Sequence, residues 1–113
     1  MLLVSSCSIY FEPSFNLSNE TRVYQVIDGD TLLLNGGEYV RLIGIGAPEK
    51  GSEGYYEAAE FLRNLTEGKV VTLESEGADR DRYGRLLRHV IVNGTDAGGA
   101  LLENGLAVPY RDN

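Results

Sequence analysis

The sequence predicts a small α+β domain, mostly β, in which five strands form a barrel and two helices pack against it. Two observations lead to this prediction. Short runs of β-branched, leucine and aromatic residues are separated by Gly, Asn and Asp turn signals. Two longer segments instead repeat apolar residues every three to four positions, which is the period of an α-helix. The chain has 113 residues, enough for one such domain, and its 14 glycines suit many short strands joined by tight turns.

The first three strands are expected to form a meander. They are predicted at residues 22–27, 31–34 and 38–45. Asp28-Gly29 between the first two runs is a strong hairpin signal, and Asn35-Gly36-Gly37 provides the next turn. A meander of this kind brings the turn after the first strand close to the end of the third strand.

A helix is predicted over residues 53–66, between the third and fourth strands. Its apolar stripe consists of Ala58, Phe61, Leu62 and Leu65, at helical spacing. Ser52 is the expected N-cap, and Gly68 follows the helix as a terminator. The stripe predicts that one face of this helix packs on the barrel.

Two further strands and a second helix complete the domain. The strands are predicted at residues 69–74 and 84–92, and the helix begins near Thr95 or Asp96. The order β-β-β-α-β-β-α is that of a five-stranded Greek-key barrel of the oligonucleotide/oligosaccharide-binding (OB) type. Residues 1–20 show no period and are expected to form an extended N-terminal arm, which leaves residues 21–113 as the barrel domain.

The charge of the chain limits the classes of function. A net charge of −7 argues against strong non-specific affinity for nucleic acid, because that affinity comes mainly from Lys and Arg. A local site for one phosphate group is still compatible with it. Four arginines gather at Arg80, Arg82, Arg85 and Arg88. Taken alone, this run is interpreted as a solvated hairpin diluted by neighbouring aspartates.

The N-terminal residues bear on localisation. Cys7 is the only cysteine, so an intrachain disulfide is excluded, and the apolar runs are too short for a membrane span. Residues 4–7 resemble a lipoprotein cleavage box, although only three residues precede them. A stray free cysteine in the arm is the simpler interpretation. The expectation is a secreted or cell-surface anchored protein.

Charged side chains at the two strand ends indicate chemistry. Asp30 and Glu49 offer oxygen atoms suited to a hard cation, and Arg41 offers a guanidinium fork suited to phosphate. A structural interpretation is also open, in which Asp28 and Asp30 only stabilise the hairpin turn and Arg85 only pairs with Asp81. The sequence alone does not decide between the two.

Four motifs resemble landmarks of the staphylococcal nuclease (thermonuclease) domain family. They are Val26-Ile-Asp-Gly-Asp-Thr31, Val40-Arg-Leu-Ile-Gly-Ile-Gly-Ala-Pro-Glu49, Asp81-Arg-Tyr-Gly-Arg85 and Leu102-Glu-Asn-Gly-Leu-Ala107. Their order and spacing agree with the family from about residue 21 to residue 107. The resemblance implies hydrolysis of phosphodiesters in single-stranded DNA or RNA, usually with calcium. It implies Asp30 and the backbone carbonyl of Ala47 as metal ligands.

The resemblance also implies roles for five other side chains. Arg41 and Arg85 match the two arginines that bind the scissile phosphate. Glu49 matches the carboxylate that positions or deprotonates the attacking water. Arg82 and Tyr83 match residues near the bound nucleotide. These residue types suit the chemistry, because attack on a phosphodiester builds negative charge that guanidinium groups and a cation offset.

Two departures from the family pattern qualify the expectation. Gly46 stands where the family has a metal-binding aspartate, and the loss of one charged ligand should weaken calcium binding by on the order of 1–3 kcal/mol. Six residues follow Ala107, where family domains carry a third helix. We expect the apolar arm residues to cover the surface left by that helix, in the same chain or in a second copy as a homodimer. These arm residues are Ile9, Tyr10, Phe11 and Phe15.

Two functions therefore follow from the sequence. The first is a calcium-dependent nuclease, weakened by Gly46. The second is a catalytically silent barrel that binds nucleic acid or protein, which Gly46 and the acidic charge favour. Arg41, Glu49 and Arg85 favour the nuclease.

Overall fold

The computed structural model describes residues 19–111, so the predicted arm lies almost entirely outside the described residues. The strands of the described part are β1 (Glu20–Asp28), β2 (Thr31–Leu34), β3 (Tyr39–Leu42), β4 (Ile45–Gly46), β5 (Val70–Glu74), β6 (Leu86–Val92), β7 (Thr95–Asp96) and β8 (Val108–Pro109). The helices there are α2 (Tyr55–Thr66) and α3 (Ala97–Glu103). None of the helices within residues 19–111 is long and apolar enough to cross a membrane.

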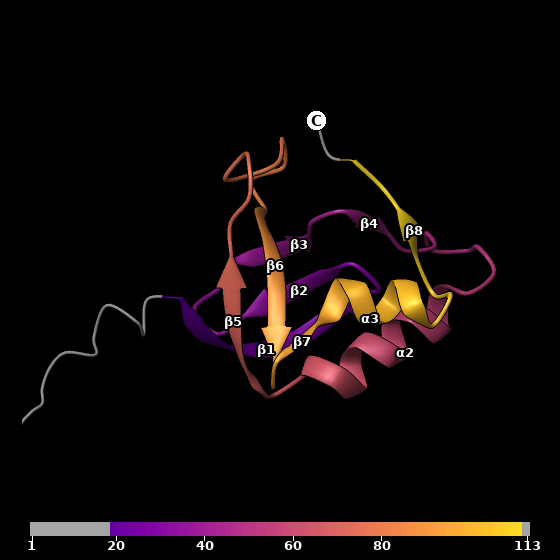
Figure 1. Ribbon diagram of the computed structural model, residues 1–113, viewed down its shortest axis with the longest axis horizontal. Coiled ribbons are helices and arrows are strands. Elements are labelled where there is room, and N and C mark those ends of the chain that lie inside the picture. Colours follow the sequence, from indigo (N-terminus) through magenta and orange to yellow (C-terminus); the bar gives the residue numbers. More distant parts are fainter. Residues whose placement is uncertain (1–18, 112–113) are drawn as a thin grey trace, which may run out of the picture.

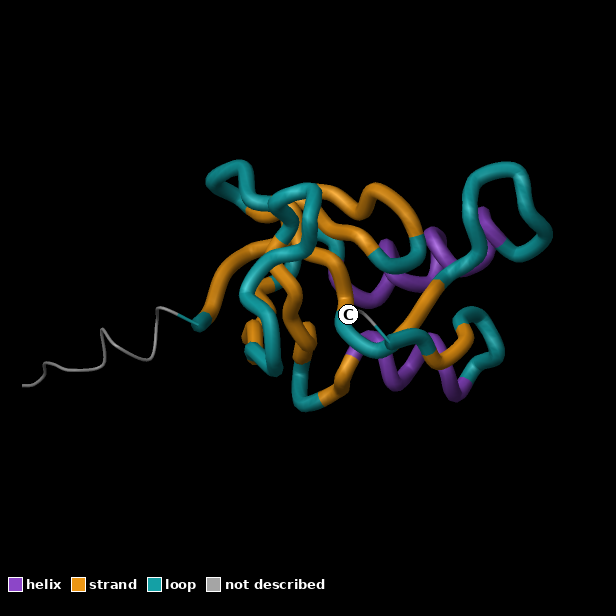
Figure 2. The backbone as a smooth tube through the Cα atoms, turned by 90° about the horizontal axis from the view of Figure 1, so that it is seen from above, coloured by secondary structure: helices purple, strands orange, loops and turns teal. Residues whose placement is uncertain are grey.

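The strands close into a barrel, which confirms the predicted fold class. Their order is β3-β2-β1-β5-β6-β7, and a parallel pairing of β3 with β6 joins the two sides of the sheet. The closed barrel thus consists of β1, β2, β3, β5 and β6, and the short β7 extends the edge of β6. Figure 1 shows α2 and α3 lying together beside the barrel, and Figure 2 shows the same arrangement from above.

The core lies inside the barrel, and the buried residues of β1 are three positions apart because its pairing with β2 shifts register between Val23 and Gln25. The buried side chains include Val23 and Val26 of β1, Leu32 of β2, Val40 of β3 and Val90 of β6. The helices complete this core. Ala58 and Leu62 of α2 and Leu101 of α3 have exposed fractions of 0%. The predicted apolar stripe of α2 is confirmed, with Phe61 and Leu65 packed at its margin.

The two helices begin differently. α3 begins where expected, and Asp96 is its N-cap, because its side chain accepts a hydrogen bond from the Gly99 backbone N–H at 3.2 Å. The prediction that Ser52 caps the first helix is wrong. α2 begins at Tyr55, after Gly54 with a φ of 89°, and no side chain caps it. Ser52 contributes its backbone carbonyl to Tyr55 N–H instead, within the turn that precedes the helix.

The third predicted strand is interrupted. β3 ends at Leu42, and Gly44 adopts a φ of 85°, a left-handed conformation that breaks the extended run before β4. The C-terminal segment, for which no strand was predicted, returns as β8 and pairs antiparallel with β4. Figure 1 shows β8 running beside β4. This pairing brings Tyr110 to the end of the barrel where β3 finishes, and its N–H donates to the Gly44 carbonyl at 2.9 Å.

Three segments meet at Gly29, the residue between the first two strands. A Cβ atom on Gly29 would lie 2.6 Å from the Cβ of Ala47 and 2.7 Å from the Cβ of Ala58. Those distances are shorter than van der Waals contact, so only glycine allows the β1–β2 turn, the segment after β4 and α2 to approach this closely. The turn that carries Asp30 is thereby set against the segment that carries Ala47.

We predict that Gly29→Ala destabilises the fold, because the added methyl group must push one of the two neighbouring segments away. The free energy of unfolding should fall by about 1–3 kcal/mol, the range for overpacked sites. Urea unfolding followed by circular dichroism measures this change.

Gly98→Ala is the matched control, because Gly98 is also buried and lies in α3. A Cβ atom on Gly98 would lie 3.6 Å from the nearest side-chain atom, Cγ2 of Ile45, which is ordinary van der Waals contact. This substitution should leave stability unchanged or raise it slightly, since alanine favours a helix. Equal effects of the two substitutions would contradict the close approach at Gly29.

Candidate active site

Asp30 joins two segments that are distant in sequence. It lies in the β1–β2 turn, where its N–H donates to the Asp28 carboxylate at 3.1 Å. Its Oδ1 accepts a hydrogen bond from the Thr31 hydroxyl, and its Oδ2 accepts one from the Ala47 N–H, both at 3.1 Å. Asp28 thus stabilises the turn itself, whereas Asp30 links the turn to the residue that follows β4. The predicted juxtaposition of Asp30 and Ala47 is present.

Arg41 is a buried cation on β3. Its side chain lies close to Asp30, with 3.8 Å between Nη1 and Oδ2. Nη1 donates to the backbone carbonyls of Leu42 at 2.6 Å and Ile45 at 2.9 Å. The residue is only 8% exposed. These carbonyl contacts fix one arm of the guanidinium at the turn between β3 and β4.

Arg85 immediately precedes β6 and reaches the same region from the other side of the β3–β6 pairing. Its Nε donates to Asp81 Oδ2 at 2.7 Å, and its Nη1 donates to the Thr31 hydroxyl at 3.2 Å. The Asp81 carboxylate also accepts hydrogen bonds from the backbone N–H groups of Tyr83 and Arg85. Arg85 therefore does more than pair with Asp81, since it also touches the residue next to Asp30.

Thr31 connects these groups and was not singled out from the sequence. It is 4% exposed and lies directly opposite Arg41 in the β2–β3 register. Its hydroxyl receives the Arg85 hydrogen bond and donates to Asp30, which makes a continuous path from Arg85 to Asp30 and on to Ala47. The only sequence signal for this role is its place immediately after Asp30. Asp30, Arg41, Ala47 and Arg85 therefore form one cluster.

The remaining predicted residues lie at the margin of this cluster. Glu49 follows β4 with an exposed side chain, and its backbone carbonyl accepts from Ser52 N–H at 2.8 Å. Tyr83 is 70% exposed. Its ring centroid lies 5.1 Å from the Cζ of Arg82 and 5.5 Å from the Cζ of Arg85. The structure thus places an exposed ring and an exposed cation beside the buried groups.

Arg80 and Arg88, two further arginines of the run from Arg80 to Arg88, make ion pairs with neighbouring carboxylates. Arg80 makes a bidentate ion pair with Glu38, with distances of 2.9 and 3.0 Å. Arg88 contacts the Asp79 carboxylate at 2.8 Å. The interpretation of this run as a solvated hairpin therefore holds for Arg80, whereas the Arg88 side chain is only 15% exposed on β6 and Arg85 belongs to the cluster.

Two carboxyl groups of this region have shifted pKa values. Burial, followed by the hydrogen bond and the charge of Asp30, raises the pKa of Asp28 above its ordinary value. Burial also acts to raise the pKa of Asp81, but hydrogen bonds from Arg85 and Tyr83 outweigh it and leave that pKa below its ordinary value. The Asp81 carboxylate is therefore a stable anion that anchors Arg85.

The cluster fits part of what calcium requires, because that ion takes about six to eight oxygen ligands. The carboxylate of Asp30, the adjacent Asp28 and the backbone carbonyls of the β4 segment are hard oxygen donors of the right kind. Within residues 19–111, however, no group of three or more His, Cys, Asp or Glu side chains that could hold a metal ion is present. The donor set therefore fits a hard cation in type but supplies few ligands, so water would complete the shell.

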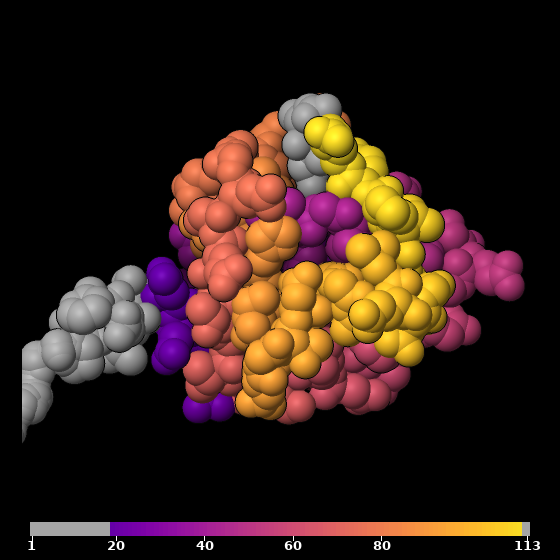
Figure 3. Space-filling model, viewed as in Figure 1, coloured from indigo at the N-terminus to yellow at the C-terminus, as the bar shows by residue number. Residues whose placement is uncertain are grey.

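Gly46 borders the C-terminal segment rather than open solvent. A Cβ atom there would lie 3.4 Å from the Cβ of Tyr110 and 3.6 Å from its Cγ. Figure 3 shows the yellow C-terminal segment lying against the magenta surface of the β3–β4 region. The position where the family carries an aspartate is thus next to an aromatic side chain in this chain.

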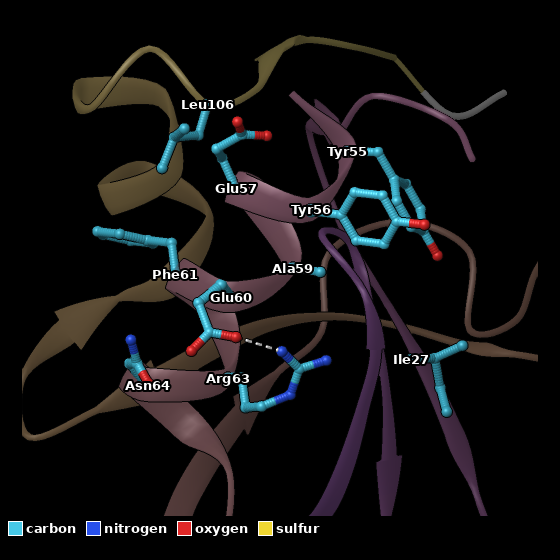
Figure 4. A pocket seen from close by; sticks show the side chains of 10 residues that line it. All are labelled: Ile27, Tyr55, Tyr56, Glu57, Ala59, Glu60, Phe61, Arg63, Asn64 and Leu106. Atoms are coloured by element: carbon cyan, nitrogen blue, oxygen red, sulfur yellow. Dashed lines mark hydrogen bonds and ion pairs between the residues drawn. The ribbon is translucent and has the colours of Figure 1, made fainter. Parts of the chain in front are cut away.

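A separate pocket lies over α2. It has a volume of about 710 Å³ and is lined by residues that include Ile27, Tyr55, Tyr56, Phe61 and Leu106. Figure 4 shows its side chains arranged around α2, with Glu60 and Arg63 joined by an ion pair. None of the predicted site residues lines it, so the pocket and the cluster are different parts of the surface.

Comparisons with known proteins agree with the resemblance seen in the sequence. Residues 39–113 match the family model described as Staphylococcal nuclease homologue. The chain is 33% identical over 94 residues to a protein named Uncharacterized endonuclease from Escherichia coli O157:H7, covering 80% of the chain and 60% of the relative. It is 31% identical over 110 residues to the Thermonuclease of Staphylococcus hyicus, covering 87% of the chain and 65% of the relative.

A third relative is much longer. Endonuclease YhcR of Bacillus subtilis is 30% identical over 115 residues, which cover 87% of the chain but 9% of that protein. The chain thus spans about 60% to 65% of the first two relatives and a small part of the third.

Asp81 provides a prediction on pH. Its pKa is lower in the folded chain than its ordinary value of 3.8, so its stabilisation is present above that value and is lost as the pH falls through the folded pKa. Asp81→Asn should lower the free energy of unfolding by about 1–2 kcal/mol at pH 7. The difference from the wild type should shrink below about pH 4. Urea unfolding at several pH values measures it.

Glu103→Gln, which removes an exposed carboxylate from α3, is the control for the loss of a charge. A destabilisation by Asp81→Asn that stays constant from pH 7 to pH 3 would show that the ionised carboxylate is not what anchors the turn.

Proposed function

Because this chain belongs to the staphylococcal nuclease family, we propose that it is an endonuclease that hydrolyses phosphodiester bonds in single-stranded DNA or RNA. The observation that carries the proposal is the hydrogen-bond path from Arg85 through Thr31 to Asp30 and Ala47, with Arg41 beside it. Two cations and a carboxylate thus lie close together: Asp30 comes from the β1–β2 turn, Arg41 from β3 and Arg85 from the residue before β6.

Arg41 and Arg85 are proposed to stabilise the phosphate in the transition state. Attack on a phosphodiester increases the negative charge on its equatorial oxygens, and fixed guanidinium groups offset that charge without reorganisation during the reaction. Both side chains are fixed by hydrogen bonds that they donate. Arg41 donates to the carbonyls of Leu42 and Ile45, and Arg85 donates to the carboxylate of Asp81. Such anchoring keeps the cations in place when the substrate arrives.

Glu49 is proposed to position the attacking water and accept its proton. A carboxylate can act as a general base when it lies within hydrogen-bond reach of the water. The exposed position of Glu49 after β4 leaves it accessible to solvent. The same segment contains Ala47, whose N–H already binds Asp30, so movement of this segment would affect both residues.

Calcium is the proposed cofactor. Asp30 and the carbonyl of Ala47 would hold it, and when bound it would supply positive charge to the phosphate oxygens. Gly46 contributes no side-chain oxygen, so this chain should bind the ion more weakly than a variant with aspartate there.

Arg82 and Tyr83 are proposed to contact the nucleotide next to the scissile phosphate. The Tyr83 ring is 70% exposed and flanked by two guanidinium groups. Aromatic rings provide stacking surfaces for unpaired bases, with cation–π support from arginine. This arrangement supports a single-stranded substrate. Because the net charge is −7, the protein should contact only a few nucleotides of the substrate around the site.

The second candidate is a barrel that binds nucleic acid or protein without cleaving it. Gly46 and the acidic charge favour it. The anchoring of Arg41 and Arg85 near Asp30 favours the nuclease, because a binding surface alone would not require one buried arginine and a second one fixed by an ion pair.

The arm and the location of the protein are also proposals. Residues 1–20 would form an arm that covers the barrel of residues 21–113, in its own chain or in a homodimer, and the protein would be secreted or anchored at the cell surface.

Size-exclusion chromatography and thermal melting of a variant without residues 1–18 test the arm. An unchanged melting temperature and oligomeric state would contradict it.

The nuclease proposal predicts cleavage of single-stranded DNA that requires calcium and stops with a chelator. Arg85→Gln and Glu49→Gln should each lower kcat roughly 100- to 1,000-fold, the range for removing one transition-state contact. Gly46→Asp should lower the calcium concentration needed for half-maximal rate. Gel assays of a labelled oligonucleotide measure all three.

Arg63→Gln and Glu53→Gln are matched controls that change the same residue types outside the cluster, and they should retain the wild-type rate. If neither the wild type nor Gly46→Asp cleaves with any divalent cation, the protein is the silent barrel instead.

A further inference from the structure

The pairing of β4 with β8 brings the Tyr110 ring against the guanidinium of Arg41. β8 pairs with β4 through Pro109 and Val108, and the Tyr110 N–H donates to the Gly44 carbonyl at 2.9 Å. With its backbone held there, the Tyr110 ring has its centroid 5.5 Å from the Cζ of Arg41. This distance is within the range of a cation–π contact.

Gly46 makes room for this ring. A Cβ atom on Gly46 would already contact the Cβ, Cγ and Cδ1 of Tyr110 at 3.4, 3.6 and 3.9 Å. A longer side chain at position 46 would have to extend beside the ring. Glycine therefore leaves the near edge of the Tyr110 ring free of a side chain from position 46.

The exposed fractions of the two residues indicate that the contact matters more for the position of Arg41 than for the packing of Tyr110. Tyr110 is 54% exposed, so its ring is not a core side chain and contributes little to the packing of the barrel. Arg41 is 8% exposed. Carbonyls of Leu42 and Ile45 hold its Nη1 from one side, and the ring lies against the same guanidinium.

We propose that Tyr110 is a positioning residue for Arg41: its ring, admitted by Gly46, holds the guanidinium in the orientation in which it meets the phosphate. This inference rests on the proposed nuclease function. The ring acts through Arg41 and not on the reacting atoms, so it should affect the rate of the chemical step more than the binding of substrate. Its hydroxyl has no part in the contact, so phenylalanine should replace tyrosine.

The test compares Tyr110→Leu, which keeps an apolar side chain but removes the π face, with Tyr110→Phe, which keeps the ring. Tyr24→Leu is the matched control, because Tyr24 is 64% exposed on β1 and takes part in none of the cation–π contacts within residues 19–111. Two quantities are measured for each variant. They are the NMR shift of the Arg41 Nε–Hε group, which reports the ring current of Tyr110, and the kcat and KM for a short single-stranded oligonucleotide.

The expected result is specific to the ring. Tyr110→Leu should shift the Arg41 signal and lower kcat roughly threefold to tenfold at nearly constant KM, as a contact of cation–π strength implies. Tyr110→Phe and Tyr24→Leu should match the wild type in both measurements.

Several results would overturn the inference. For Tyr110→Leu, these are an Arg41 signal that does not move, or an unchanged kcat. A rise in KM alone in that variant would mean that the ring binds substrate directly. A Tyr110→Phe variant as slow as Tyr110→Leu would also contradict the role of the ring. If the wild type itself cleaves nothing, the nuclease proposal fails together with the catalytic role of Tyr110. The Arg41 signal then shows separately whether the ring holds the guanidinium.

Discussion

The site depends on how closely three segments approach one another at Gly29. The absence of a side chain there lets the turn after β1, the segment after β4 and helix α2 come within the distance that any Cβ atom would block. Once the turn and the β4 segment are in contact, Asp30 can accept the Ala47 N–H. The same β4 segment supplies the Ile45 carbonyl that holds Arg41. A packing constraint thus sets the geometry of the charged groups.

Charge is concentrated locally in a domain that is acidic as a whole. The net charge is −7, yet Arg41 on β3 and Arg85 just before β6 contact Asp30 and Thr31, which are neighbours in the chain. Arg80 and Arg88 are instead used in ion pairs with Glu38 and Asp79. This distribution suits recognition of one phosphate at a fixed place better than attachment to a long polyanion, since non-specific affinity grows with the number of cations that contact phosphates.

The barrel and α2 could be predicted because alternation and the helical stripe are local signals. β8 could not, since a strand of two residues, Val108–Pro109, has no period, and only its partner β4 defines it. The Ser52 cap failed because Gly54 adopts a left-handed conformation that starts the helix later. In the site, the motifs identified Asp30, Arg41 and Arg85. The role of Thr31 and the contact of Tyr110 with Gly46 depend on strand register and chain return, which no local pattern encodes.

The central claim is that Arg41 and Arg85 flank one phosphate beside Asp30. A crystal structure with calcium and a dinucleotide whose bridging phosphate resists cleavage tests this most directly. The account predicts that this phosphate contacts both guanidinium groups, with the ion at Asp30 and the Ala47 carbonyl. A phosphate bound elsewhere, for example at the pocket over α2, with Arg41 and Arg85 unchanged in their present contacts, would contradict it.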